Sequence, residues 1–215
     1  MPRMWKEDIF KQKSLWEVYS LSKKAFPSSK QNKRICIFAA VFLLIVFGAS
    51  IDVTPESYKA KNALQFMNWA SGQSFTLSLG ILGFLIAGFA IFASITNVNI
   101  FISLAETPYK QYPSINNLQY VFFNFLNVFA VYVGLLTISL GVQFMSADSS
   151  PLLSLFPKCI HEHQRILVFT GEAVSFIICQ WTVISVLRLK SFIWNLYQTV
   201  LLAIALEDEM KKGTN

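Results

Sequence analysis

Four polar residues in a predicted outer loop have the clearest potential for chemistry. Cys159, His161, Glu162 and His163 carry thiol, imidazole and carboxylate groups, which are common metal ligands. An H-x-H pair can chelate a metal from a strand, but here it precedes a predicted helix and no second cluster accompanies it. We therefore interpret this group as a solvated loop and expect no metal. A pH-sensing role for the two histidines is the alternative.

Three further polar side chains are expected within the apolar part of the chain, where such groups are costly and often functional. Glu172 lies about two helical turns into the fourth apolar segment from its outer side. Asn124 and Asn127 lie near the inner end of the third segment, on the opposite side of the bilayer, so the three cannot form one site. Glu172 either pairs with Arg165 or a hydroxyl of a neighbouring helix, or lines a cation-selective pore.

The motifs of common enzymes are absent from the chain. There is no G-x-S-x-G turn, P-loop or H-E-x-x-H sequence. The three cysteines, Cys36, Cys159 and Cys179, include no C-x-x-C pair, and their odd number gives no disulfide framework. We expect a non-enzymatic protein without a cofactor.

Small and weakly polar residues recur at helical spacing in three apolar segments. Such stripes permit the close approach on which helix association in lipid depends. They either pack the segments of one subunit together, or join subunits or line a pore. The first apolar segment has almost no such face and is expected to be peripheral. The stripes are Thr76, Gly80, Gly83, Ala87, Ala90 and Ser94 in the second segment; Asn127, Ala130, Gly134, Thr137 and Gly141 in the third; and Glu172, Ser175, Cys179 and Thr182 in the fourth.

The elements that must position these residues are transmembrane helices. Only 14% of the residues are charged, against about 25% in soluble domains, and 54% are hydrophobic. A spanning helix needs about 20 apolar residues, and the segments are apolar on all sides, unlike barrel strands. We predict an all-α, polytopic membrane protein with four spans, at about 35–51, 74–95, 118–145 and 166–187.

The positions of the basic residues predict the orientation. Both termini and the loop after the second span together hold 14 of the 18 Lys and Arg residues. Basic residues are concentrated on the cytoplasmic side, so we place both termini in the cytoplasm of a bacterial inner membrane. The domains are then a basic arm (1–33), a transmembrane domain (34–187) and a cytoplasmic extension (188–215). The arm is expected to face anionic lipid headgroups rather than nucleic acid.

The basic arm is itself predicted to be an amphipathic helix. Trp5, Ile9, Trp16 and Tyr19 fall on one stripe at helical spacing, and Pro27 ends the pattern. Tryptophan and tyrosine beside many lysines are typical of a helix in the membrane interface. Packing on the cytoplasmic part of the protein is the alternative.

The C-terminal segment is predicted to continue the fourth span as one long helix. No proline occurs from Ile166 to Leu206, and a helix of that length would measure about 60 Å, twice the hydrocarbon core of about 30 Å. Its second half should project into the cytoplasm; a short fifth span over 192–206 is the alternative. The projecting half carries an apolar seam expected to contact protein, formed by Leu189, Ile193, Leu196, Val200 and Ala203.

The run LGFLIAGFAIFASITNVNIF (Leu82–Phe101) lies in a small four-span protein with a basic start and a long end helix. This layout resembles the membrane subunit of bacterial Kiwa antiphage systems. The resemblance implies a homo-oligomer that senses phage at the envelope and docks a soluble cytoplasmic partner. Our first hypothesis is a non-catalytic membrane sensor or scaffold that oligomerises and docks such a partner, because the apolar seam of the long end helix needs a protein to cover it. A small homo-oligomeric pore or ion channel is the alternative.

Overall fold

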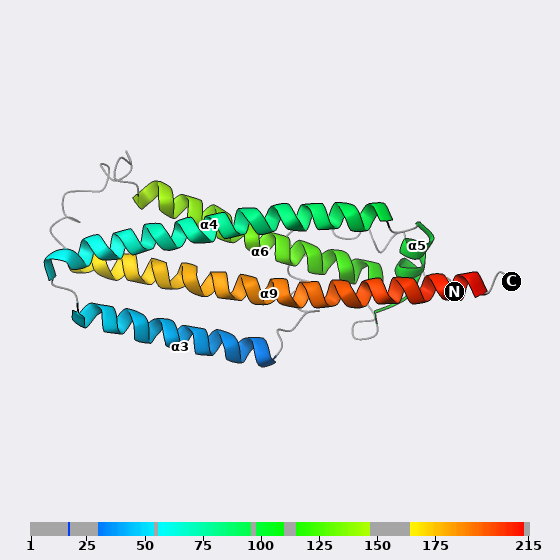
Figure 1. The fold of residues 1–215 in the computed structure, drawn as a ribbon, viewed down its shortest axis with the longest axis horizontal. Helices are drawn as coiled ribbons and strands as arrows, with labels where there is room; N and C mark the ends of the chain where they lie inside the picture. The colour runs from blue at the N-terminus through cyan, green and yellow to red at the C-terminus, as the bar shows by residue number, and fades with distance from the viewer. Residues whose placement is uncertain are drawn as a thin grey trace. The chain divides into compact units, whose positions relative to one another are not determined.

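The computed structural model describes residue 17 and residues 30–53, 56–95, 98–109, 115–146 and 164–212 (Figure 1). Over these residues the chain is all-α, as predicted, and the β-structure is limited to an isolated bridge between Pro108 and Asn116. The five helices are α3 (Lys30–Val53), α4 (Glu56–Ile95), α5 (Val98–Glu106), α6 (Asn117–Ser146) and α9 (Gln164–Lys212).

Four of these helices are long and apolar enough to cross a membrane, as expected for a multi-pass membrane protein. The candidate spans are Lys30–Gly48, Lys61–Ser94, Asn117–Ser146 and Val168–Leu201. Helix α9 is unbroken over 49 residues, so the chain has no turn between Arg188 and Phe192. A separate fifth span over 192–206 would need such a turn.

The helices divide into two compact units. Unit 2 comprises Ser29–Leu82 and Tyr132–Val186, which includes all of α3 and one part each of α4, α6 and α9. Its interior is built from Met67 and Ala70 on α4, Leu135 on α6 and Ile178 on α9. Helix α3 lies at its edge, because none of the residues in its apolar span is buried. This matches the peripheral position expected from its lack of a small-residue face.

Two contacts in unit 2 set the register between α4 and α9. A Cβ atom at Gly171 would meet Ala63, and Ser74 shares a hydrogen bond with Thr182. Both pairs are 108 positions apart in the chain, so the two helices run in the same direction, as alternate spans should.

This register changes the predicted bounds of the spans. Ser74 is the first residue of the predicted second span, 74–95, whereas Thr182 lies near the end of the predicted fourth span, 166–187. In the structure the two residues nevertheless lie at the same height along α4 and α9, because their side chains are hydrogen-bonded. The wider apolar segments of α4 and α9 are each 34 residues long, and their limits are 107 positions apart, close to the separation of 108 in the two contacts. Each measures about 50 Å, well beyond a hydrocarbon core of about 30 Å. The predicted spans are therefore only parts of longer apolar segments.

Unit 1 contains Met1–Ser28, Gly83–Val131 and Leu187–Asn215, and its described part is made of α5 and one end each of α4, α6 and α9. Its interior is aromatic: Phe89 stacks on Phe125 at 4.7 Å, and Phe125 lies 6.0 Å from Phe192, measured between ring centroids. The short helix α5 adds the buried side chains of Ile100 and Leu104.

A capping box starts α6 within unit 1. The Asn116 side chain accepts a hydrogen bond from the backbone N–H of Gln119, and the Gln119 side chain accepts one from the backbone N–H of Asn116. These bonds satisfy backbone donors that the first turn of a helix leaves unpaired. The stacked rings of Tyr109 and Tyr120, 4.1 Å apart, hold the preceding loop against this turn.

Candidate functional site

The interior of unit 2 is lined with hydroxyl groups. Thr182 donates its one hydroxyl proton to the carbonyl of Ile178, so Ser74 must be the donor in the 2.8 Å bond between Ser74 and Thr182. Gln143 on α6 donates to the Ser71 carbonyl of α4 at 3.3 Å. Hydrogen bonds of this kind are among the few attractive forces between helices in lipid. They tie the unit 2 portions of α4, α6 and α9 together.

Three of the buried hydroxyls in unit 2 have no partner among the described residues. Ser78 on α4 and both Tyr132 and Ser139 on α6 are fully buried, and their hydroxyls make no hydrogen bond there. Tyr132 and Ser139 are seven positions apart, or about two turns, and so lie on one face of α6. Each unsatisfied group is costly in an apolar interior, and sites of this kind commonly hold water or ligand.

Close backbone approach is concentrated at Gly171, a residue outside the predicted stripes. A Cβ atom there would lie 3.1 Å from the Ala63 Cβ and 3.2 Å from the Ala63 carbonyl carbon. At Gly134, within the predicted α6 stripe, it would lie 3.3 Å from the Trp181 ring. The glycine that brings two helix backbones together is therefore Gly171. Its sequence signal was its position four residues before Ser175, in phase with the α9 stripe.

The predicted stripe of α4 lies on an exposed face. All six of its residues are exposed, and Cβ atoms built at Gly80 and Gly83 would meet nothing within 4 Å. In the part of the chain that the structure describes, this stripe therefore does not pack α4 against another helix. The buried face carries a different series that sequence reasoning missed: Ala63, Met67, Ala70, Ser71, Ser74, Ser78, Leu82 and Leu85.

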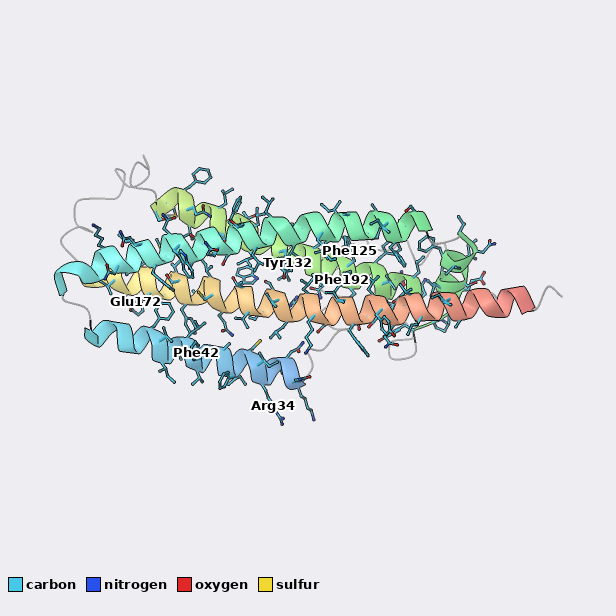
Figure 2. All side chains as sticks on the ribbon, viewed as in Figure 1. Arg34, Phe42, Phe125, Tyr132, Glu172 and Phe192 are labelled. Carbon is cyan, nitrogen blue, oxygen red and sulfur yellow. The ribbon has the colours of Figure 1, made fainter. Side chains whose placement is uncertain are left out.

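The predicted stripes of α6 and α9 are divided between buried and exposed positions. On α6, Asn127 is buried and Gly134 half-buried, whereas Ala130, Thr137 and Gly141 are exposed. On α9, Ser175 is buried, while Glu172, Cys179 and Thr182 are half-buried. Glu172 has an interaction partner in the structure, and Figure 2 shows its position on α9.

Unit 1 holds the predicted intramembrane asparagines together with an arginine that sequence reasoning did not connect to them. The Arg188 guanidinium on α9 donates a 2.8 Å hydrogen bond to the Asn127 side-chain oxygen on α6. Asn124, one turn earlier on α6, is buried with 7% of its surface exposed. Figure 2 shows Phe125 and Phe192, whose rings form an aromatic contact between α6 and α9 in the same unit. The pairing of Arg188 with Asn127 joins residues 61 positions apart.

The predicted seam of α9 is only partly covered by unit 1. Leu189 and Leu196 are half-buried, whereas Ile193 and Val200 are exposed at 50% and 40%. Among the described side chains of this half of α9, Phe192 and Thr199 are buried, and each lies one position before a member of the exposed pair. For Ala203 the structure gives only its place in α9.

Several predicted sites lie outside the described residues. They are the interfacial residues Trp5, Ile9, Trp16 and Tyr19 and the loop cluster around Cys159 and His161. Within the described ranges, no group of three or more His, Cys, Asp or Glu side chains could hold a metal ion. A scan of protein-family models, a search of curated proteins and a search of solved structures each find no match to this chain.

Proposed function

We propose that this protein is a non-catalytic membrane scaffold that assembles with further copies of itself through α4. The observation that carries the proposal is the exposed stripe of small residues, from Thr76 to Ser94, in which Cβ atoms built at Gly80 and Gly83 meet nothing within 4 Å among the described residues. Small residues facing lipid bury little apolar surface, whereas against a second helix they permit close backbone contact. A second copy of α4 supplies the same stripe, and self-complementary surfaces are typical of homo-oligomers.

A docking role for the end of α9 is supported by its exposed apolar side chains. Within unit 1, Trp194, Tyr197, Leu201 and Ile204 are all exposed by 44% or more. The apolar segments of α4 and α9 are each longer than the hydrocarbon core is thick, and in our proposal this end of α9 is the part that lies beyond the core. Apolar surface in water calls for a protein partner. In our proposal a cytoplasmic protein covers it.

The setting of this scaffold in our proposal is a bacterial inner membrane, with both termini in the cytoplasm. The support is the concentration of Lys and Arg in the terminal segments. A role as sensor in antiphage defence is proposed on the layout that the chain shares with Kiwa membrane subunits. Phage challenge of cells that carry or lack the gene, together with its neighbouring genes, tests this role.

Disulfide cross-linking in native membranes tests the assembly. In a chain whose three cysteines are replaced by serine, Ala87→Cys should form a disulfide-linked dimer on mild oxidation. Ile86→Cys is the matched control, because Ile86 is the adjacent residue and is 56% exposed but lies off the stripe. Adding Gly83→Leu to the Ala87→Cys chain should abolish the dimer, because a bulky side chain forces the helices apart.

Two results would refute assembly through α4. One is equal cross-linking of the Ala87→Cys and Ile86→Cys chains, and the other is a dimer that persists with Gly83→Leu. Gly48→Leu is the control for the substitution itself, because Gly48 is exposed on α3 and has no neighbour within 4 Å of a built Cβ. It should leave the dimer unchanged.

The pore remains a second candidate function because of the unpartnered hydroxyls in unit 2. Ser78, Tyr132 and Ser139 are fully buried polar groups that water or a passing ion could satisfy. Ion flux into proteoliposomes that contain the purified protein tests this function. Flux that falls with Tyr132→Phe and with Ser139→Ala, at unchanged protein content, would establish it in place of the scaffold. Flux equal to that of empty liposomes excludes it.

A further inference from the structure

Arg188 is a positive charge without a counter-charge in the described part of the chain. It lies within the apolar segment Val168–Leu201, is half-buried, and its bond to Asn127 is the one interaction that it makes with described residues. Asn127 is neutral, so it orients the guanidinium without compensating its charge. A charged side chain in an apolar segment is costly, and it commonly marks a functional site with a partner.

The hydrogen-bond donors around Arg188 are arranged for an oxyanion. A guanidinium has five N–H donors in a planar fork that matches phosphate, and the bond to Asn127 uses one of them. Asn124 lies three positions before Asn127, on the same face of α6, and its buried amide makes no hydrogen bond with any described residue. Its two N–H donors therefore lie about one helical turn along α6 from the residue that holds the guanidinium.

The surroundings of these donors favour a lipid over a soluble anion. Phe125 and Phe192 are in contact between α6 and α9, and in the sequence each lies within about one helical turn of Asn127 or Arg188. Arg188 itself lies in the apolar segment Val168–Leu201, which a lipid phosphate can reach from the membrane interface, whereas a free phosphate would have to leave water.

We propose that Arg188, Asn127 and Asn124 bind the phosphate group of an anionic membrane lipid. The lipid must be anionic because a zwitterionic headgroup carries its own cation and would leave the charge of Arg188 uncompensated. This site lies wholly within unit 1 and does not depend on the scaffold function.

Lipid-dependent thermal stabilisation of the delipidated protein in a neutral detergent tests the site. Phosphatidylglycerol should raise the melting temperature more than phosphatidylcholine with the same acyl chains, because a ligand that binds the native state stabilises it. Arg188→Gln should weaken the apparent affinity for phosphatidylglycerol by about 10-fold or more, the usual effect of losing charged hydrogen bonds. Arg188→Lys keeps the charge but not the planar fork of donors, so its apparent affinity for phosphatidylglycerol should lie between that of the unmodified protein and that of Arg188→Gln.

Lys190→Gln is the matched control for the charge. It removes the same charge from the same helix at an exposed position, and residues two apart do not share a helix face. It should change the apparent affinity by less than about 2-fold, because exposed charges contribute little. Asn124→Leu removes the amide at similar volume and should weaken the binding of phosphatidylglycerol without removing any charge.

Three outcomes would overturn the proposal. Equal stabilisation by phosphatidylglycerol and phosphatidylcholine would show that the headgroup charge is not recognised. An equal loss of affinity with Lys190→Gln and Arg188→Gln would reduce the effect to general electrostatics. The third outcome is that inorganic phosphate stabilises the protein more than chloride does at the same ionic strength, while phosphatidylglycerol has no effect. The ligand would then be a soluble anion. If Arg188→Gln does not fold, Arg188→Lys and Asn124→Leu still decide between these results.

Discussion

Gly171→Ala is the change whose effect on stability follows most directly from the structure. The new Cβ would lie 3.1 Å from the Ala63 Cβ, 3.2 Å from its carbonyl carbon and 3.3 Å from its carbonyl oxygen. Carbon atoms pack best at about 3.5–4.0 Å, so α4 and α9 would have to separate by a few tenths of an ångström. Two of the three atoms belong to the backbone, which cannot rotate away as a side chain can.

The expected magnitude is the difference between two terms. Overpacking a closely packed site costs about 1–3 kcal/mol, and replacing glycine by alanine in a helix interior gains about 1 kcal/mol. Gly171→Ala should therefore lower the free energy of unfolding by about 0–2 kcal/mol. Gly88→Ala is the control, because a Cβ at Gly88 meets nothing within 4 Å and only the gain of about 1 kcal/mol remains. The two variants should differ by about 1–3 kcal/mol.

The assay is equilibrium unfolding of the purified protein in mixed micelles, titrated with a denaturing detergent and followed by circular dichroism. A second variant locates the effect: Ala63→Gly should recover part of the loss in the Gly171→Ala chain, because it removes one of the three crowded atoms. A Gly171→Ala protein as stable as Gly88→Ala would refute the close approach. So would a double mutant whose effect is the sum of the two single changes, because residues in contact are expected to be coupled.

Three further predictions concern orientation, the end of α9 and the interior of unit 2. A reporter that fluoresces only in the cytoplasm should be active when fused after Asn215, whereas activity of a periplasmic reporter there would contradict the proposed orientation. Ile193→Glu combined with Val200→Glu should leave the protein inserted and folded, because both side chains are exposed. The same change should abolish capture of the cytoplasmic partner, and unchanged capture would exclude this seam as the docking surface. A double-mutant cycle of Ser74→Ala and Thr182→Val should give a coupling of about 0.5–1.5 kcal/mol in detergent unfolding, and a coupling near zero would mean that the bond does not join the helices.

The sequence predicted the elements of this protein better than their faces. Long apolar runs without proline predict helices, and the structure has them, with α9 unbroken where the sequence lacks any stop signal. Choosing the buried face of α4 failed because the side chains that face lipid are as apolar as those that face protein. The stripe from Thr76 to Ser94 and the buried series through Ser74 and Ser78 both repeat at helical spacing. Hydropathy cannot distinguish two such faces, whereas in a soluble protein water would require the outer face to be polar.

The functional candidates divide in the same way. Glu172, Asn124 and Asn127 were visible from the sequence, because a polar residue in an apolar run is conspicuous whatever its neighbours are. The sequence predicted no partner for Arg188, because an arginine at the edge of a predicted span commonly anchors the helix at the lipid interface. Its bond to Asn127 depends on α6 and α9 lying side by side.

The sequence alone determined that this chain is all-α and that four of its helices are apolar enough to span a membrane, because length and hydropathy are properties of each segment by itself. Only the tertiary structure decided the register of α4 against α9 and the position of Gly171 against Ala63. It also decided that the small residues of α4 are exposed. These features depend on contacts between helices far apart in the chain, and in lipid such contacts are selected by shape and hydrogen bonding, which leave little trace in hydropathy.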